Sequence, residues 1–269
     1  MSDRPLGFLS RLFGKKSEAA AAARVELPLA QATVGLCFDY ERGVAYDSEY
    51  LSDVGLDLVM KKLQHHRLRA TFHCPAKLCE TAFPKLEQIL AAGHEIAALG
   101  YADEDARALS LDALKQMLYA CRNTFNARGL QPIGFRAAGG RWDDRLAGEL
   151  GRHRFVYSAE HDHARKLYVL HPGEPPLVRV PIRTDDRLLR SRAEKRELAM
   201  SNHHRYVRRA VQEKSFASVC FHPWILAEDL DRMRHWEEWL DTAVGTGVRL
   251  VPLHEALPPS HRPASPAAP

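Results

Sequence analysis

Five side chains in separate segments could move protons or bind a metal ion. Asp39 and Glu41 stand two residues apart directly after an apolar run, and Arg136 lies in a glycine-rich segment. His73 and His222 each follow another apolar run. Suitably placed carboxylates and imidazoles transfer protons near neutral pH, and both types bind divalent cations. The residue types therefore indicate acid–base or metal-assisted chemistry.

These side chains fall at the ends of predicted strands. Residues 34–38 form a strand-like run that ends at Asp39, and residues 94–99 predict a third strand. Between them, residues 51–63 carry apolar side chains at helical spacing, and residues 83–90 predict a second helix that ends before Gly93. Strands that alternate with helices indicate parallel βαβ units, whose carboxyl ends can gather side chains into one site.

In this order the motifs resemble those of the polysaccharide deacetylase family, also called the NodB-homology domain or carbohydrate esterase family four. The resemblance extends from about residue 32 to residue 257. It implies an α/β fold, namely a distorted (β/α) barrel of mostly parallel strands. The segments that carry it are residues 39–41, 70–73, 91–96, 136–140 and 219–223, with weaker matches at 151–158, 177–181 and 185–186.

The resemblance also implies an activity. Family members use a divalent metal, usually zinc, to activate water against an N-acetyl or similar carbon–nitrogen bond. Matched to this chain, Asp39 is the general base, Arg136 orients it, His222 is the acid, and Glu41 binds the metal. A metal with an open coordination position lowers the pKa of bound water to about 7. We therefore expect a hydrolase that cleaves an amide of an N-acylated sugar or sugar phosphate.

The second family motif departs from the pattern. Where the family has two histidines four residues apart, this chain has Leu99 and Asp103. Leucine has no lone pair to donate, so Asp103 and His73 are the candidates to complete a metal shell with Glu41. Such a carboxylate-rich shell suits manganese or magnesium as readily as zinc. The loop at 161–163, which reads His-Asp-His, is a further candidate, although a solvated loop is the simpler explanation.

A second hypothesis comes from a different functional class. The chain could be a catalytically inactive relative that binds no metal and keeps the barrel for carbohydrate or protein binding. Asp39, Arg136 and His222 together favour catalysis, because a binding protein has little need for a base, its orienting cation and an acid. Leu99 favours the inactive alternative. The enzyme hypothesis is the one we prefer from sequence.

The five cysteines form no Cys-X-X-Cys pair. Cys37 and Cys220 lie two residues before Asp39 and His222, so each shares a strand face with its partner. Buried thiols in the barrel interior are the simplest interpretation, and a metal or redox role is the alternative. An odd number of unpaired cysteines, with no secretory leader, predicts reduced thiols in the cytoplasm.

Composition predicts one globular domain with two tails. The chain has 269 residues, of which 45% are hydrophobic, with a net charge of +4 and no apolar run long enough to cross a bilayer. Residues 31–257 form the predicted barrel, and the Pro- and Ala-rich residues 258–269 are predicted to be disordered. Residues 1–30 predict a basic, Ala-rich tail, whose amphipathic start at 8–13 is a candidate for weak contact with the inner face of the membrane.

The most basic internal region is residues 183–214. It could attract a phosphorylated or lipid-linked sugar, although a solvated helix face is the commoner meaning of such a run. Aromatic residues are sparse there, so we expect no specific nucleic-acid partner. The apolar positions that predict helices packed on one side are Leu188, Leu189, Leu198, Tyr206, Val207 and Val211.

Overall fold

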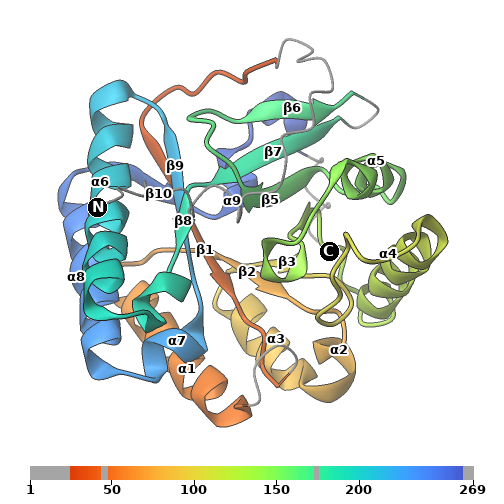
Figure 1. The fold of residues 1–269 in the computed structure, drawn as a ribbon, viewed down its shortest axis with the longest axis horizontal. Coiled ribbons are helices and arrows are strands. Elements are labelled where there is room, and N and C mark those ends of the chain that lie inside the picture. Colours follow the sequence, from red (N-terminus) through yellow and green to blue (C-terminus); the bar gives the residue numbers. More distant parts are fainter. Residues whose placement is uncertain (1–24, 44–47, 173–175, 263–269) are drawn as a thin grey trace, which may run out of the picture.

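The protein is built on one curled sheet, seen in a computed structural model that describes residues 25–43, 48–172 and 176–262. The strand order is β6-β7-β5-β4-β3-β2-β1-β9-β8, with β10 paired to β1 (Figure 1). Every pairing is parallel except that of β6 with β7. The strands are β1 Thr33–Asp39, β2 Thr71–Cys74, β3 Glu95–Ala98, β4 Gly134–Phe135, β5 Tyr157–His161, β6 Tyr168–His171, β7 Leu177–Ile182, β8 Thr184–Asp185, β9 Phe216–Phe221 and β10 Arg249–Val251.

Helices cover the outside of this sheet. Figure 1 shows α6 and α8 together on one flank, and α4 and α5 on the opposite flank. The α-helices are α1 Glu49–His65, α2 Leu78–Thr81, α3 Phe83–Ala91, α4 Leu111–Asn126, α5 Asp144–Arg152, α6 Ala193–Glu213, α7 Pro223–Ala227, α8 Leu230–Gly245 and α9 Leu253–Ala256. Three short 3-10 helices are η1 Ala138–Gly140, η2 Arg187–Arg190 and η3 Pro259–His261.

The sheet closes on itself through one residue. Arg183 alone separates β7 from β8, and β8 pairs in parallel with β9. The backbone N–H of Arg183 donates to the carbonyl of Ser218 in β9 at 3.1 Å. Backbone hydrogen bonds therefore connect the end of β7 to β9. This confirms the predicted α/β fold, a distorted (β/α) barrel of mostly parallel strands.

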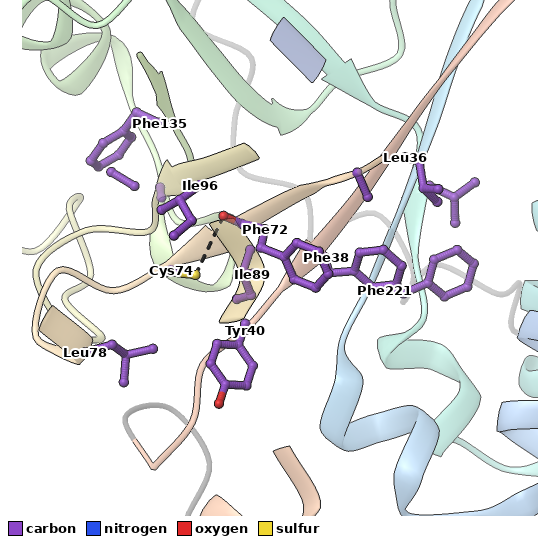
Figure 2. Close-up of a cluster of buried hydrophobic side chains, with 14 of the residues drawn as sticks. Leu36, Phe38, Tyr40, Phe72, Cys74, Leu78, Ile89, Ile96, Phe135 and Phe221 are labelled. Atoms are coloured by element: carbon purple, nitrogen blue, oxygen red, sulfur yellow. Dashed lines mark hydrogen bonds between the residues drawn. The ribbon is translucent and has the colours of Figure 1, made fainter. Parts of the chain in front are cut away.

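Alternation along β1 separates two layers of core. Leu36, Phe38 and Tyr40 point out toward the helices, where Phe38 stacks on Phe72 with ring centroids 5.0 Å apart (Figure 2). Cys37 packs instead with the interior residues of the barrel. Successive strand residues point to opposite faces, so Asp39 lies on the same inner face as Cys37. The side chain of Asp39 therefore points into the barrel.

The predicted helices form for local reasons that the sequence shows. Ser48 caps α1, because its Oγ accepts from the N–H of Leu51 at 3.1 Å. Gly93 follows α3 with φ of +78°, a left-handed conformation that glycine adopts without strain. Gly55 of α1 lies against the backbone of α7, because a Cβ added there would meet the Pro223 oxygen at 2.0 Å. This close approach fixes the turn that follows His222.

Helix α6 and the preceding 3-10 helix η2 differ in part from the sequence prediction. Leu188, Leu198 and Val211 are exposed, whereas Leu189 and Val207 are buried as expected and Tyr206 packs partly buried against the core. The buried face of α6 consists of Ala199, His203, Val207 and Ala210. This buried face consists mainly of small residues and a histidine. The positions of the large apolar residues therefore predicted the buried side of α6 only in part.

The chain ends lie only partly within the described residues. Leu27 is buried, and its N–H donates to the Leu167 carbonyl at 2.8 Å, so the barrel recruits residues that the sequence assigned to the tail. At the other end, η3 adds one short turn beyond residue 257. The amphipathic segment 8–13 and residues 263–269 lie outside the described residues. Among the described helices, none is long and apolar enough to cross a membrane.

We predict that Gly55→Ala destabilises the protein by about 1–3 kcal/mol, because the new methyl group would force α1 away from the α7 backbone. The matched control is Gly148→Ala in α5, where an added Cβ meets nothing within 4 Å. Alanine should stabilise that helix slightly. Urea unfolding measures both changes, and equal stabilities for the two variants would contradict the close contact.

Acid should also weaken the fold through His203. Its Nε2 lies 3.1 Å from the Asp185 carbonyl, and its Nδ1 lies 3.1 Å from Nε2 of His235. Burial lowers the pKa of His203 from 6.5 to about 4. Between these two pH values the unfolded chain therefore binds a proton at His203 that the folded chain does not bind. We expect about 3 kcal/mol of stability to be lost as pH falls from about 6.5 to 4. Tryptophan fluorescence follows unfolding, and a flat stability over that window would contradict the assignment.

Candidate functional site

Four of the predicted site residues meet at the carboxyl ends of strands β1, β2, β4 and β9. Asp39 ends β1, its register partner His73 lies on β2, and His222 follows β9. Arg136 follows β4, and its N–H donates to the Ala98 carbonyl of β3 at 2.8 Å. All four side chains are fully buried. Parallel strands place such residues together because their carboxyl ends share one rim of the barrel.

Asp39 is held by donors on both carboxylate oxygens. Arg136 Nε donates to Oδ2 at 2.9 Å. His73 Nδ1 lies 2.9 Å from Oδ1, and the Cys220 thiol donates to the same oxygen at 3.2 Å. Burial alone would raise the pKa of Asp39, but the Arg136 charge and the His222 and His73 hydrogen bonds outweigh it and hold the pKa well below 3.8. Asp39 is therefore an anion with a fixed orientation.

Arg136 is itself anchored by β5. Its Nη1 donates to the Ala159 carbonyl at 2.9 Å and lies 4.0 Å from Glu160 Oε2. Glu160 also accepts the N–H of Ala137 at 2.7 Å. Burial raises the pKa of Glu160 to about 7, against the opposing charges of Arg136 and Arg179. Glu160, on β5, therefore supports Arg136 through the strand that carries both contacts.

His222 is paired with a carboxylate of its own. Asp186 accepts from the His222 backbone N–H at 2.8 Å and lies 2.5 Å from Nδ1. Burial opposes protonation of His222, but Asp186 and Asp39 raise its pKa to about 10. Its Nε2 lies 3.4 Å from Asp39 Oδ2. A protonated imidazole thus faces the carboxylate base, each with its own support.

Glu41 is occupied by protein donors. Arg187 Nη2 donates to Oε1 at 2.9 Å, and Trp224 Nε1 donates to Oε2 at 3.0 Å. Asp39, Glu41 and His222 do offer ligand atoms within 4.8 Å of one another. Each of these atoms already has a counter-charge or donor, so a cation would have to displace the Arg187 guanidinium. In this arrangement the residues do not fit the metal that the resemblance implies.

The other proposed ligands have separate fates. Asp103 is exposed and ion-paired with Arg141, so the structure does not bring it to Glu41. Its short loop after Leu99 carries it to the surface, where a cation neutralises it. Leu99 is buried as an apolar residue. His73 does reach the site, but it contacts Asp39.

The His-Asp-His loop gives the site its border. His161 Nε2 lies 3.0 Å from Asp185 Oδ2, whereas Asp162 caps the N–H of Ala164 and accepts from Tyr168. The side chains of His161 and Arg187 keep 42% and 38% of their surface exposed. His161 contacts Asp185, and Arg187 contacts Glu41, at the edge of the buried cluster. These two side chains therefore mark the side from which solvent approaches the cluster.

Four functional candidates were missed from sequence: Glu160, Asp186, Arg187 and Trp224. The pair Asp185-Asp186 follows a predicted strand and was noted in the sequence as a weaker family match, but no function was assigned to it. Arg187 was counted only as part of a basic run. Its pairing with Glu41 joins residues 146 positions apart, and no local pattern reveals such a contact.

Comparisons with known proteins place the fold. No family model and no curated protein sequence matches the chain. A structure assigned as a polysaccharide deacetylase from Mycobacterium smegmatis matches with a TM-score of 0.74 and 18% identity, over 87% of this chain and 92% of that one. Puue allantoinase matches with a TM-score of 0.67 and 16% identity, over 84% and 88%.

A third structural neighbour lacks activity. It is described as a pseudoenzyme of carbohydrate esterase family four from Bacillus anthracis, with a TM-score of 0.59 and 14% identity, over 87% of this chain and 68% of that one. A mutant of that protein has restored enzymatic activity. These likenesses show that the chain has the polysaccharide deacetylase fold, that of the NodB-homology domain and carbohydrate esterase family four.

Proposed function

We propose that the protein is a deacetylase-like hydrolase that cleaves the amide bond of an N-acylated sugar, without a metal at Glu41. One observation carries the proposal: the Asp39–Arg136 and His222–Asp186 pairs converge, with 3.4 Å between Asp39 Oδ2 and His222 Nε2. Each pair holds its reacting group in the charge state that hydrolysis requires. A carbohydrate substrate follows from the deacetylase neighbours, and a phosphorylated sugar would suit the basic 183–214 region.

Asp39 would act as the general base. Arg136 and His73 hold its carboxylate anionic, so Oδ2 can accept a proton from a water that attacks the amide carbonyl. Full burial excludes bulk solvent and strengthens these interactions. Arg136 cannot deprotonate in a protein, so its role is to orient the base and not to relay a proton.

His222 would act as the general acid toward the leaving amine. Asp186 holds the Nδ1 side, so the proton to be donated sits on Nε2, 3.4 Å from Asp39 Oδ2. Arg187 Nε makes no hydrogen bond with the described residues. A guanidinium at this position can stabilise the oxyanion that forms on the amide oxygen, the task a metal would perform in the family.

The inactive alternative has its own support. Asp39, Glu41 and His222 are all buried, and Arg187 and Trp224 cover Glu41. A substrate must move Arg187 to reach His222. If Arg187 is a permanent seal, the barrel is a binding module, and one structural neighbour is itself described as a pseudoenzyme. A cytoplasmic location and membrane contact remain predictions from sequence.

Asp39→Asn tests the base. We expect at least a hundredfold loss in kcat on the best substrate from a panel of N-acylated sugars, because the amide cannot accept the proton. Asp241→Asn is the control, since Asp241 forms a surface pair with Lys62 at 3.0 Å. Circular dichroism establishes that both variants fold. Full activity in Asp39→Asn would refute the base assignment, and no turnover in the parent would favour the binding module.

Arg187→Ala tests the absence of a metal step. We expect turnover to fall at least tenfold with Arg187→Ala, while chelators leave the parent unchanged, because the guanidinium and not a bound ion faces the site. Arg234→Ala is the matched control, as Arg234 is exposed and pairs with Asp231 on α8 at 3.2 Å. Loss of parent activity on chelation with the fold intact by circular dichroism, restored by zinc, would contradict the metal-free step.

A further inference from the structure

A second group of potential metal ligands lies one layer below the base. Cys37, His73 and Cys220 offer ligand atoms within 4.8 Å of one another, and all three side chains are fully buried. Cys37 and Cys220 are register partners on β1 and β9, and His73 comes from β2 on the other side of β1. Three strands thus aim soft ligands at one point in the barrel interior.

Asp39 closes this group on the side of the catalytic cluster. Its Oδ1 lies 2.9 Å from His73 Nδ1 and 3.2 Å from the Cys220 sulfur. In a tetrahedral zinc site, bonds of about 2.0–2.3 Å place neighbouring ligand atoms roughly 3–4 Å apart. The separations in the protein are already of that order. Side-chain rotations would have to draw Cys37, His73 and Cys220, which lie within 4.8 Å of one another, closer together around an ion that Asp39 Oδ1 also reaches.

We propose that Cys37, Cys220, His73 and Asp39 Oδ1 form a closed zinc site. Two thiols and one imidazole are the donors that zinc prefers in structural sites. On binding, each thiol releases its proton to solvent, and the two thiolates balance the dication. The interior therefore gains no net charge, which removes the main cost of burying an ion.

This ion would be structural. Four protein ligands leave no open position for water or substrate, so it takes no part in hydrolysis, which proceeds from Asp39 Oδ2 as proposed above. It would fix the orientation of the base from below. His73 Nε2 is buried and makes no hydrogen bond with the described residues, so the imidazole is free to turn either nitrogen toward the ion. Because no ligand is exposed, loading must accompany folding.

Metal analysis of protein expressed with added zinc tests the site. We expect about one equivalent in the parent and less than a tenth of that in Cys37→Ala and Cys220→Ala. Cys121→Ala is the matched control, because that buried thiol contacts the Gly100 carbonyl at 3.3 Å in another part of the barrel. Glu41→Gln should also keep its zinc, which separates this site from any metal near Glu41.

Refolding the parent with cobalt decides the question if the cysteine variants do not fold. Two thiolate ligands give intense near-ultraviolet charge-transfer absorption, and tetrahedral cobalt gives strong visible bands. Both signals are expected from the parent. A parent without zinc after folding in its presence, cobalt bound without the thiolate band, or zinc retained by both cysteine variants would each overturn the proposal. None of these results depends on whether the protein hydrolyses an amide.

Discussion

The site depends on one buried negative charge, the carboxylate of Asp39. A lone carboxylate in a barrel interior would be protonated, because burial disfavours the charged form. Here the guanidinium of Arg136 and donors from His73 and Cys220 surround it. These partners come from strands β2, β9 and the segment after β4, so the carboxylate requires the barrel to close correctly. The fold and this buried carboxylate therefore stabilise each other.

The same principle accounts for the surroundings of Glu41. A family site balances its second carboxylate with a divalent ion, whereas Glu41 is balanced by Arg187 and Trp224. The guanidinium meets the electrostatic need that histidine ligands and a metal would otherwise meet. Leu99 then carries no penalty as an apolar core residue. Under the proposed function, Arg187 would supply the positive charge at Glu41 that a metal supplies in the family.

Much of this could be predicted from sequence, and what was missed has a physical pattern. Strand ends at Asp39, His73 and His222 followed from local hydrophobicity, and alternation placed Cys37 and Cys220 inside the barrel. The prediction that Asp103 binds a metal was wrong, because Asp103 lies on a short exposed loop and pairs with Arg141. Arg187 was missed because an ion pair between distant segments depends on barrel closure, which leaves no local pattern. The buried face of α6 was misjudged because alanines and His203 form it.

The measurement that tests this account most directly is a double-mutant cycle on the buried pair, with Asp39→Asn, Arg136→Gln and the double variant. Each single change leaves a buried group unbalanced, so we expect each to cost about 3–5 kcal/mol in urea unfolding. Removing both charges should cost less than the sum of the single changes by about 2 kcal/mol. Additive losses would contradict the claim that the two charges depend on each other.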